Sequence, residues 1–510
     1  MKKLRLILGD QLNSNHSWFH EVNDNTIYLM AEMRQETVYV KHHIQKVVAF
    51  FLSMRNFAET LQSNGHRVVY FKISDVGNAH NLEQIIHNCI NQYEVAAFEY
   101  QYPDEYRLDK QLKTISLNLK IETKAVDTEH FYTTRSELSD FFEGKKMLLM
   151  ENFYRMMRKK HHVLMNGSMP VGDAWNFDKD NRLKYKGQVP IPHAIEFKKN
   201  VSDIVAEIEQ ATIDTFGTID AENFNWPTNR IECLEQLTFF CENLLVHFGD
   251  YEDAMHTHEK FLFHSRLSFA MNTKMLAPQE VVDKVIVYYF DNKDTISISQ
   301  VEGFVRQILG WREYIRGIYW KEMPLYSKLN ILENYNKLPH FYWSGKTNMN
   351  CMQKAISQSL NEAYAHHIQR LMIIGNFSLL TQLHPDEVDA WYLGVYIDAI
   401  EWVEMPNTRG MSQYADGGIV ATKPYVSSGS YINKMSNYCS SCHYNVKEKL
   451  AHNACPFNSL YWNFLDDKKH IFATNQRMGM MLNLLNKISP DELAKIKAKA
   501  SHIIENPDLY

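Results

Sequence analysis

The sequence predicts an N-terminal α/β domain with a parallel, Rossmann-like sheet, followed by a large all-α domain. Short apolar runs alternate with helical patterns over roughly the first 130 residues, a rhythm typical of βαβ units. From about residue 215 to the end, apolar residues recur at helical spacing. We therefore divide the chain into an α/β domain at 1–130, an interdomain linker at 131–215 and a helical domain at 216–510.

Composition sets the next limits. A chain of 510 residues can form two large domains or about three ordinary ones. Its 45% hydrophobic and 22% charged residues exclude global disorder. Sixty acidic and 54 basic residues give a net charge of −6. A chain that coats nucleic acid over its whole surface would be basic, so any polyanion site here must be a local basic face.

The sequence also indicates a location. The apolar run at the N-terminus is too short for a signal peptide, and no run of 18 apolar residues could span a membrane. Seven cysteines in 510 residues are too few for a secreted disulfide scaffold. We expect a cytoplasmic protein with reduced thiols and no membrane contact, acting as a monomer.

Within the α/β domain, Gly9 and Asp10 directly follow the first strand and mark the carboxyl edge of the sheet, where ligands bind in such folds. A simple turn is the alternative. The G-x-G-x-x-G and P-loop patterns are absent. The expected strands are Leu4–Leu8, Val68–Phe71 and Val95–Tyr100, and the expected helices are Val38–Leu61 and Leu82–Ile90.

The rest of the chain adds a basic patch and long helical patterns. Arg155, Arg158, Lys159 and Lys160 form the patch in the linker, which is either a set of phosphate contacts or a solvated helix face. The expected helices of the C-terminal domain are Ile231–Phe248, Val301–Trp320, Asn361–Leu383 and Val388–Trp402.

Four cysteines predict a metal centre. Cys439 and Cys442 form a C-x2-C pair, Cys455 follows with a proline directly after it, and Cys351 lies upstream. Four thiolates suit either tetrahedral zinc or a [4Fe–4S] cluster, and the spacing does not separate the two. The closing Cys-Pro favours iron–sulfur slightly. The remaining cysteines, Cys89, Cys233 and Cys241, lie on apolar patterns and are expected in the core.

Four helical motifs complete the pattern, and together with the cysteines they resemble the cryptochrome and photolyase family. The match is to its iron–sulfur bacterial branch, which includes prokaryotic (6-4) photolyases, and it covers nearly the whole chain. Besides the cysteines it rests on the segments Leu6–Leu12, Trp175–Arg182, His264–Ser268, Gly310–Tyr314, His366–Leu371, Trp391–Asn407 and Gly410–Gly418.

The resemblance implies FAD in the helical domain, with its pyrophosphate near the segment 264–268. Arg370 and Asp398 match the family's ion pair beside the flavin. Glu404 stands where many photolyases place an Asn facing flavin N5, a departure that alters the protons available there. The residues implied at the flavin are Tyr251, His264, Ser265, Arg266, Leu267, Ser268, Trp311, Arg312, Arg370, Asp398, Glu404 and Asn407.

The same resemblance implies two further cofactors and the partner. A [4Fe–4S] cluster is held by Cys351, Cys439, Cys442 and Cys455. A 6,7-dimethyl-8-ribityllumazine antenna lies at the carboxyl edge of the sheet, bound by Gly9, Asp10, Glu36 and Tyr39. The partner is damaged DNA, contacted by Arg155, Arg158, Lys159, Lys160 and Arg182.

The implied activity is light-driven repair of (6-4) photoproducts by electron transfer from excited reduced FAD, coupled to proton transfer from His366 or His367. Trp391, Tyr392 and Trp343 match the electron-transfer route to the flavin, with buried aromatic core as the plain alternative. Two other functions stay open. One is a blue-light photoreceptor that signals without repair, and the other is a DNA-binding protein whose four-cysteine site is only structural.

Overall fold

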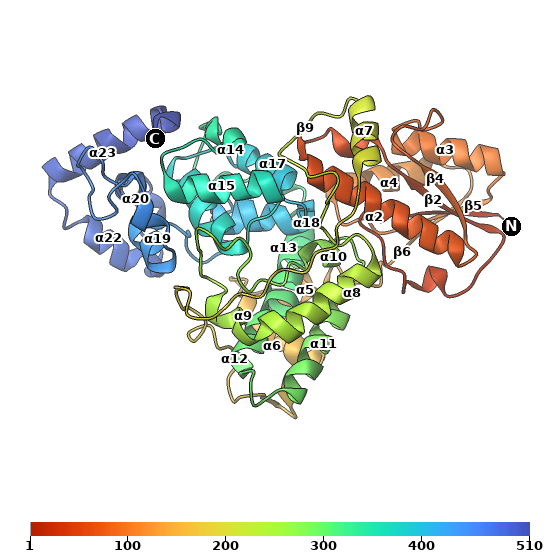
Figure 1. Cartoon of the computed structure of the whole chain (residues 1–510), viewed down its shortest axis with the longest axis horizontal. Coiled ribbons are helices and arrows are strands. Elements are labelled where there is room, and N and C mark those ends of the chain that lie inside the picture. Colours follow the sequence, from red (N-terminus) through yellow and green to blue (C-terminus); the bar gives the residue numbers. More distant parts are fainter. Residues whose placement is uncertain (1) are drawn as a thin grey trace.

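The computed structural model describes residues 2–510. The sheet domain and the C-terminal helices lie at opposite ends of the molecule, and a group of helices from the middle of the chain projects between them (Figure 1). Within residues 2–510, no helix combines the length and the apolar composition that crossing a bilayer requires.

The N-terminal domain is built on a five-stranded parallel sheet, which confirms the predicted fold class. Its strands are β1 (Lys3–Leu6), β2 (Thr26–Ala31), β4 (Arg67–Phe71), β5 (Ala97–Gln101) and β6 (Glu122–Val126), in the order β4-β2-β1-β5-β6. Leu4 of β1 pairs with Ile27 on one side and with Phe98 on the other. The strand order therefore reverses at β1, and Gly9 and Asp10 follow at this switch point, where such sheets bind ligands.

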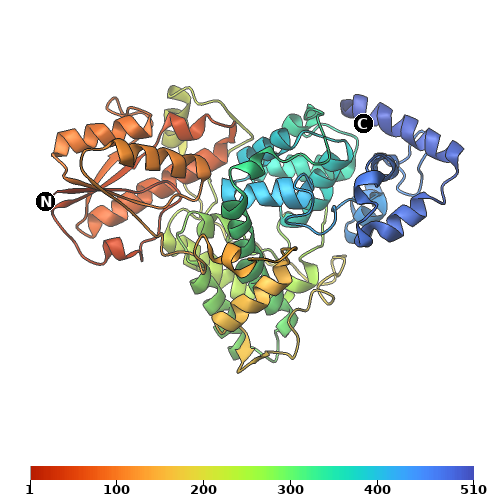
Figure 2. The same cartoon turned by 180° about the vertical axis from the view of Figure 1, so that it is seen from behind.

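Helices cover both faces of the sheet (Figure 2). The long helix α2 (Ile44–Ser63) buries Val48 and Phe51 with Tyr28 and Met30 of β2 on one face. Helices α3 (Leu82–Tyr93) and α4 (Tyr106–Asn118) pack on the opposite face. A short helix, α1 (Arg34–Thr37), follows β2.

The segment 131–215 contains α5 (Glu137–Phe141), α6 (Met150–Lys160), the hairpin β7 (Met165–Asn166) and β8 (Met169–Pro170), α7 (Ser202–Gln210), and β9 (Thr215–Phe216), which pairs with β3 (His42–His43). The remaining helices are α8 (Arg230–Phe239), α9 (Leu245–Tyr251), α10 (Ser268–Asn272), α11 (Pro278–Asp291), α12 (Ile298–Val305), α13 (Glu313–Glu322), α14 (Phe341–Ser344), α15 (Asn350–Glu362), α16 (Asn376–Leu380), α17 (Pro385–Val395), α18 (Glu401–Met405), α19 (Gly429–Met435), α20 (Pro456–Asp467), α21 (Lys469–Phe472), α22 (Gly479–Leu485) and α23 (Pro490–Glu505). Four π-helical turns, Phe240–Leu244, Arg306–Arg312, Gln369–Gly375 and Pro406–Ser412, join some of them.

Two of the long helices predicted from the sequence are wrong as continuous elements. In the first, α15 ends at Glu362, because Ala363 adopts a left-handed backbone with φ of 51°. The chain becomes helical again only at His367. In the second, residues 396–400 separate α17 from α18, and Ile400 is extended. These breaks contain His366 and Asp398.

Buried charged groups lock the two domains together. Lys274, just after α10, lies 3.0 Å from Asp10 and 2.8 Å from Asp104 of the sheet domain. In the opposite direction, Lys46 of α2 donates to the carbonyls of Leu393 and Ala399 at 2.6 and 2.7 Å. Each domain thus inserts one lysine into the other.

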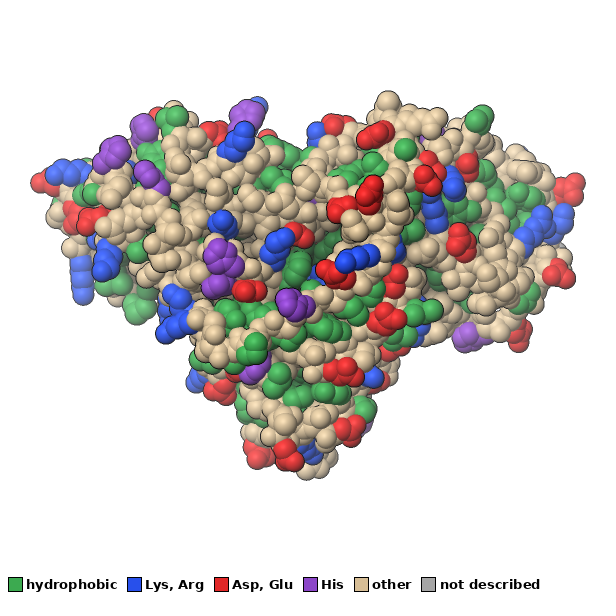
Figure 3. Space-filling view, in the orientation of Figure 1, with side chains coloured by type: hydrophobic (Ala, Val, Ile, Leu, Met, Phe, Trp, Pro, Cys, Tyr) green, Lys and Arg blue, Asp and Glu red, His purple; other side chains and the backbone are tan. Residues whose placement is uncertain are grey.

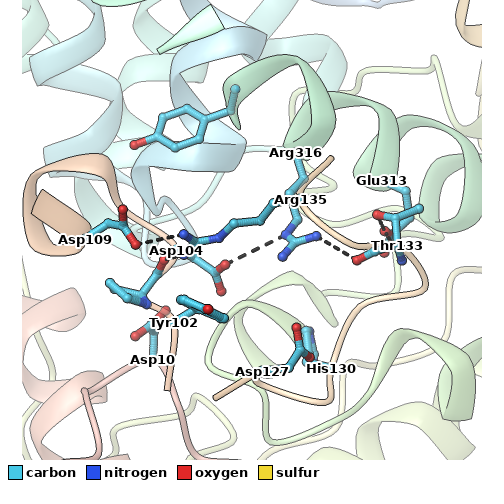
Figure 4. A network of polar contacts seen from close by, with 12 residues as sticks. Asp10, Tyr102, Asp104, Asp109, Asp127, His130, Thr133, Arg135, Glu313 and Arg316 are labelled. Carbon is cyan, nitrogen blue, oxygen red and sulfur yellow. Dashed lines mark hydrogen bonds and ion pairs between the residues drawn. The ribbon is translucent and has the colours of Figure 1, made fainter. Parts of the chain in front are cut away.

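A wider polar network surrounds Asp104 (Figure 4). Arg316 of α13 approaches Asp104 and donates to the carbonyl of Thr133, whose hydroxyl donates to Glu313 at 2.5 Å. Arg135, on the loop after β6, donates to Asp109 of α4 at 2.7 Å. The network therefore ties the carboxyl edge of the sheet to α13.

Lys274→Met should lower the melting temperature strongly, because it leaves Asp10 and Asp104 buried without their cation. Removing one partner of a buried ion pair costs about 3–5 kcal/mol of stability. Lys110→Met, on the exposed face of α4, is the matched control and should change melting little. Equal melting temperatures for the two variants in a thermal scan would show that this contact does not hold the domains.

Candidate functional site

An ion pair between Arg370 and Asp398 lies at the centre of the helical domain. The guanidinium donates to both carboxylate oxygens, at 3.0 and 3.1 Å. Ser268, the first residue of α10, donates its hydroxyl to the same carboxylate at 2.6 Å, and Asn272 of that helix donates to the Asp398 carbonyl at 2.6 Å. The helix break at 396–400 is therefore held by side chains from two other segments.

Arg266 supplies a buried positive charge near this pair. Its backbone is left-handed, with φ of 55°, and its guanidinium lies 4.4 Å from the ring centre of Phe261. It reaches Gln236 at 3.5 Å, and no carboxylate within residues 2–510 forms an ion pair with it. Burial lowers its pKa. A buried guanidinium without an acidic partner suits an anionic ligand such as a pyrophosphate.

His264 and His366 stack face to face, with ring centres 4.5 Å apart and an interplanar angle of 13°. His366 is buried, whereas His367 is exposed. Nε2 of His264 and Nδ1 of His366 have no hydrogen-bond partner among the described residues. Burial and the neighbouring histidines hold the pKa of His366 well below its usual value. The two adjacent histidines do not share a helix face, because the helix starts after His366.

Aromatic side chains lead from the ion pair towards the surface. Tyr392 donates its hydroxyl to the carbonyl of Arg370 at 2.6 Å, and its ring centre lies 5.5 Å from that of Trp391. Trp391 in turn lies 5.3 Å from Tyr342. The next residue, Trp343, is 41% exposed and packs on Phe216 at 5.1 Å. Trp391 and Tyr392 are therefore in contact, whereas Trp343 packs on Phe216 and is related to them only through its chain neighbour Tyr342.

The other residues implied at the flavin surround this group less closely. Arg312 lies over the ring of Trp402 at 4.6 Å and donates to the Met271 carbonyl at 3.1 Å. Glu404 is buried, its Oε1 has no partner among the described residues, and burial and the nearby Asp389 raise its pKa well above the usual value.

Five further implied residues contact their own surroundings. Tyr251 stacks on Phe263, the residue directly before His264, with ring centres 5.3 Å apart. Trp311 packs edge-on against Tyr314. Asn407 donates to the carbonyl of Val403 on its own helix at 2.7 Å. Ser265 and Leu267 lie beside Arg266, and the Leu267 amide donates to the Ser265 hydroxyl at 3.4 Å.

Cys351, Cys439, Cys442 and Cys455 converge on one apolar cavity of about 330 Å³ including its open mouth. They come from α15, from the turn after α19 and from the start of α20. All four are free thiols. No group of three or more ligating side chains within residues 2–510 is close enough to hold a single metal ion.

Gly429 is essential to this cavity. A β-carbon at this position would lie 2.9 Å from the sulfur of Cys455 and 2.9 Å from Val446. Only glycine leaves the space beside the sulfur free.

A second cavity, of about 1070 Å³ including its open mouth, lies at the carboxyl ends of β1, β2 and β5. Gly9, Asp10, Glu36 and Tyr39 all line it. Arg107 donates to Glu36 at 2.7 and 3.1 Å and to Glu105 at 2.7 Å, and lies over the Tyr39 ring at 4.6 Å. Burial raises the pKa of the Glu105 carboxyl to about 8. Glu36, Glu105, Tyr39 and Lys46 line the cavity, so its wall offers acids, a cation and an aromatic ring to a polar ring system, while Arg107 holds Glu36 and Glu105 in place.

The basic patch is only partly available to DNA. Arg155, Lys159, Lys160 and Arg182 are exposed, and three of them pair with Glu151, Glu137 and Asp178, contacts that are weak in solvent. The prediction that Arg158 contacts DNA is wrong. Its side chain is fully buried and donates to the carbonyls of Val163, Leu164 and Trp175. It holds the loop after α6 and cannot contact phosphate.

Figure 3 shows acidic and basic side chains interspersed over the sheet domain on the face drawn there. No single basic field dominates that side. This agrees with the net charge of −6.

Sequence reasoning missed several residues of these sites. Lys46 and Glu401 line the sheet-edge cavity, and Tyr342 and Tyr396 belong to the aromatic group, with Arg370 lying 3.8 Å over the Tyr396 ring. The i, i+4 spacing of Tyr392 and Tyr396, on consecutive turns, is a signal that could have found the latter. Lys46 gives no such signal, because it stands inside an ordinary amphipathic helix pattern.

Comparison with known proteins defines the class. Residues 5–226 match the family described as deoxyribodipyrimidine photo-lyase-related protein. The chain is 40% identical over 512 aligned residues to the (6-4) photolyase of Agrobacterium fabrum, with 100% of both chains covered. The protein therefore belongs to the photolyase and cryptochrome family.

Solved structures agree on the fold. A bacterial class III photolyase from Agrobacterium tumefaciens matches 97% of this chain and 91% of its own, with a TM-score of 0.56 and 13% sequence identity. A cryptochrome from Synechocystis matches 96% of this chain and 99% of its own, with a TM-score of 0.54 and 12% identity.

Gly429→Ala should lower the amount of metal bound per chain, because the added methyl group would press on the sulfur of Cys455. Gly479→Ala is the matched control, since a β-carbon there meets nothing within 4 Å. Metal is measured by elemental analysis of protein purified without oxygen. Equal metal content in the two variants would mean that the cysteine cavity is not the metal site.

Proposed function

We propose that the protein repairs (6-4) photoproducts in DNA under blue light. The observation that carries this proposal is the stacked His264–His366 pair in a chain that is 40% identical, over its full length, to a named (6-4) photolyase. A blue-light receptor that signals without repair would use the same flavin site, so activity on damaged DNA decides between them.

Membership of the family implies FAD. Bound FAD supplies the electron that starts repair. On the protein side, the unpaired guanidinium of Arg266 and the donors of the segment 264–268 suit the pyrophosphate. The Arg370–Asp398 pair fixes the break beside Ser268. Oε1 of the buried Glu404 carboxyl has no partner among the described residues, and burial raises the pKa of this carboxyl, which favours its protonated form.

The histidines would perform the proton step. Repair of a (6-4) lesion moves a hydroxyl group together with a proton, which an imidazole can exchange. Burial lowers the pKa of His366, so this imidazole exchanges its proton at a lower pH than a free histidine does. His366 has a free Nδ1 in the site, and His367 is open to an incoming lesion. Flipping a base towards His367 costs least at a lesion, because a lesion is already poorly stacked in the duplex.

We propose a [4Fe–4S] cluster in the four-cysteine cavity. The four cysteines line one cavity. Four thiolates suit either tetrahedral zinc or a [4Fe–4S] cluster, and the proline directly after Cys455 favours the cluster. Free thiols at all seven cysteines fit a reducing cytoplasm.

We also propose the lumazine antenna in the sheet-edge cavity. Its size, the Tyr39 ring and the Glu36–Arg107 pair support a flat, polar heterocycle. For the DNA contact, Arg155, Lys159, Lys160 and Arg182 remain as candidates, and binding through them would weaken as salt rises.

His366→Asn and His367→Asn should each retain flavin, because neither histidine is needed to hold it, and should bind DNA nearly as tightly as the parent. Repair should fall by about 10²–10⁴-fold in at least one of them, since a positioned acid contributes that much. Because the protonated imidazole is required and burial lowers the pKa of His366 well below its usual value, the parent's rate should fall as pH rises through the acidic range, below the usual imidazole pKa.

The assay is repair of a duplex carrying one (6-4) lesion by pre-reduced protein under blue light, with a cyclobutane-dimer duplex beside it. His470→Ala, an exposed histidine on α21, serves as control. Parent-like repair by both histidine variants would remove the pair from the mechanism. If the parent repairs neither duplex, the photoreceptor function is the correct one.

Glu36→Gln should reduce lumazine binding by about 10- to 100-fold, because it weakens a charge-assisted contact. FAD content and repair under direct flavin excitation should be unchanged. Glu83→Gln, exposed on α3, is the control, and both cofactors are measured after extraction. Loss of FAD with retention of lumazine would show that the sheet domain holds the other ligand.

A further inference from the structure

Gln369 is a buried glutamine that the proposed chemistry does not use. It is 1% exposed and is the first residue of the π-helical turn Gln369–Gly375. Its side-chain carbonyl accepts a hydrogen bond from the backbone amide of His366 at 3.1 Å. This is one half of a capping box, in which a residue in the first helical turn reaches back to the amide of the capping residue.

The amide group of Gln369 faces the cysteine centre. It donates to the hydroxyl of Tyr438 at 3.2 Å and to Gln358 at 3.0 Å. Tyr438 directly precedes Cys439, and its carbonyl accepts from Asn350, the neighbour of Cys351, at 2.7 Å. All of this lies outside the residues implied at the flavin.

Gln358 provides a second connection to the same centre. It stands on α15, whose first turn carries Cys351. Seven residues are two helical turns, or about 10 Å, and they place the two side chains on the same face of the helix. Two routes, one through α15 and one through Tyr438, therefore run from the cysteines and meet at Gln369.

Resting on the proposed function, we propose that Gln369 is a positioning residue that transmits the geometry of the four-cysteine centre to His366. The cysteines fix Tyr438 and the start of α15, these fix the Gln369 amide, and Gln369 fixes the backbone that carries His366 against His264. Through these contacts the four cysteines would influence repair by position, without touching the lesion.

Three variants test the connection in the complete holoprotein. Gln369→Leu removes both hydrogen-bonding ends, and Gln369→Glu keeps the acceptor for the His366 amide. Tyr438→Phe removes only a hydroxyl and keeps the buried ring. Tyr461→Phe, a buried tyrosine on α20, is the matched control.

The first readout is hydrogen exchange of the His366 amide, which requires no catalysis. Exchange should be faster in Gln369→Leu and in Tyr438→Phe than in the parent and in Tyr461→Phe. The second is repair by pre-reduced protein, where kcat should fall by about 5-fold or more for each lost buried hydrogen bond while KM for lesion DNA stays constant. Gln369→Glu should recover part of the rate.

Parent-like exchange and parent-like kcat in Tyr438→Phe and Gln369→Leu would overturn the proposal. An equal fall in kcat and an equally fast exchange of the His366 amide in Tyr461→Phe would also overturn it, because they would indicate a general loss of stability. If the parent itself fails to repair the lesion, the proposed function is wrong, and the exchange measurement alone then decides whether Gln369 positions His366.

Discussion

The break between α17 and α18 is the constraint around which the protein is arranged. Five non-helical residues in a buried region leave carbonyl groups that need donors. Asn272 supplies one to Asp398, and Lys46 supplies one to Ala399 and another to Leu393 in the last turn of α17. The Asp398 carboxylate accepts hydrogen bonds from Arg370 and Ser268. Removing any of these donors would leave a buried polar group unpaired.

This constraint also couples the two domains. Lys46 belongs to the sheet domain and lines the sheet-edge cavity, while it holds the backbone next to Asp398. Lys274 runs the other way, from the end of α10 to Asp10 in the same cavity. Helix α10 thus contacts the Arg370–Asp398 ion pair through Ser268. Lys274, just after the same helix, reaches the sheet-edge cavity. A shift of one domain would disturb both proposed chromophore sites together.

The sequence predicted most of the elements whose signals are local, but it missed the central strand β2, Thr26–Ala31, although the apolar run of that strand is a local signal. The βαβ rhythm, the position of Gly9 and Asp10, and the clustering of cysteines all follow from spacing, and the fold class is confirmed. The strand β6, Glu122–Val126, could not be predicted from the sequence, because an edge strand that contains Glu, Thr and Lys shows little apolar pattern. The burial of Arg158 was also hidden, since its charge resembles that of its exposed neighbours.

The errors in the predicted helices fall at the proposed site for a physical reason. Periodicity continued across residues 363–366 and 396–400 because both segments are buried and therefore apolar on average, although tertiary contacts impose non-helical backbone there. Such conflicts between local preference and final structure are expected where function requires a particular geometry. His366 and Asp398 lie in these two breaks. The Asp398 carboxylate is held by Ser268 and Arg370, which are distant in sequence. The His366 backbone amide is held by Gln369, three residues further on, and Tyr438 contacts Gln369 in turn. In a continuous helix, the helical period would determine the direction of both side chains. Contacts from the cysteine centre or from α10 could then not position them.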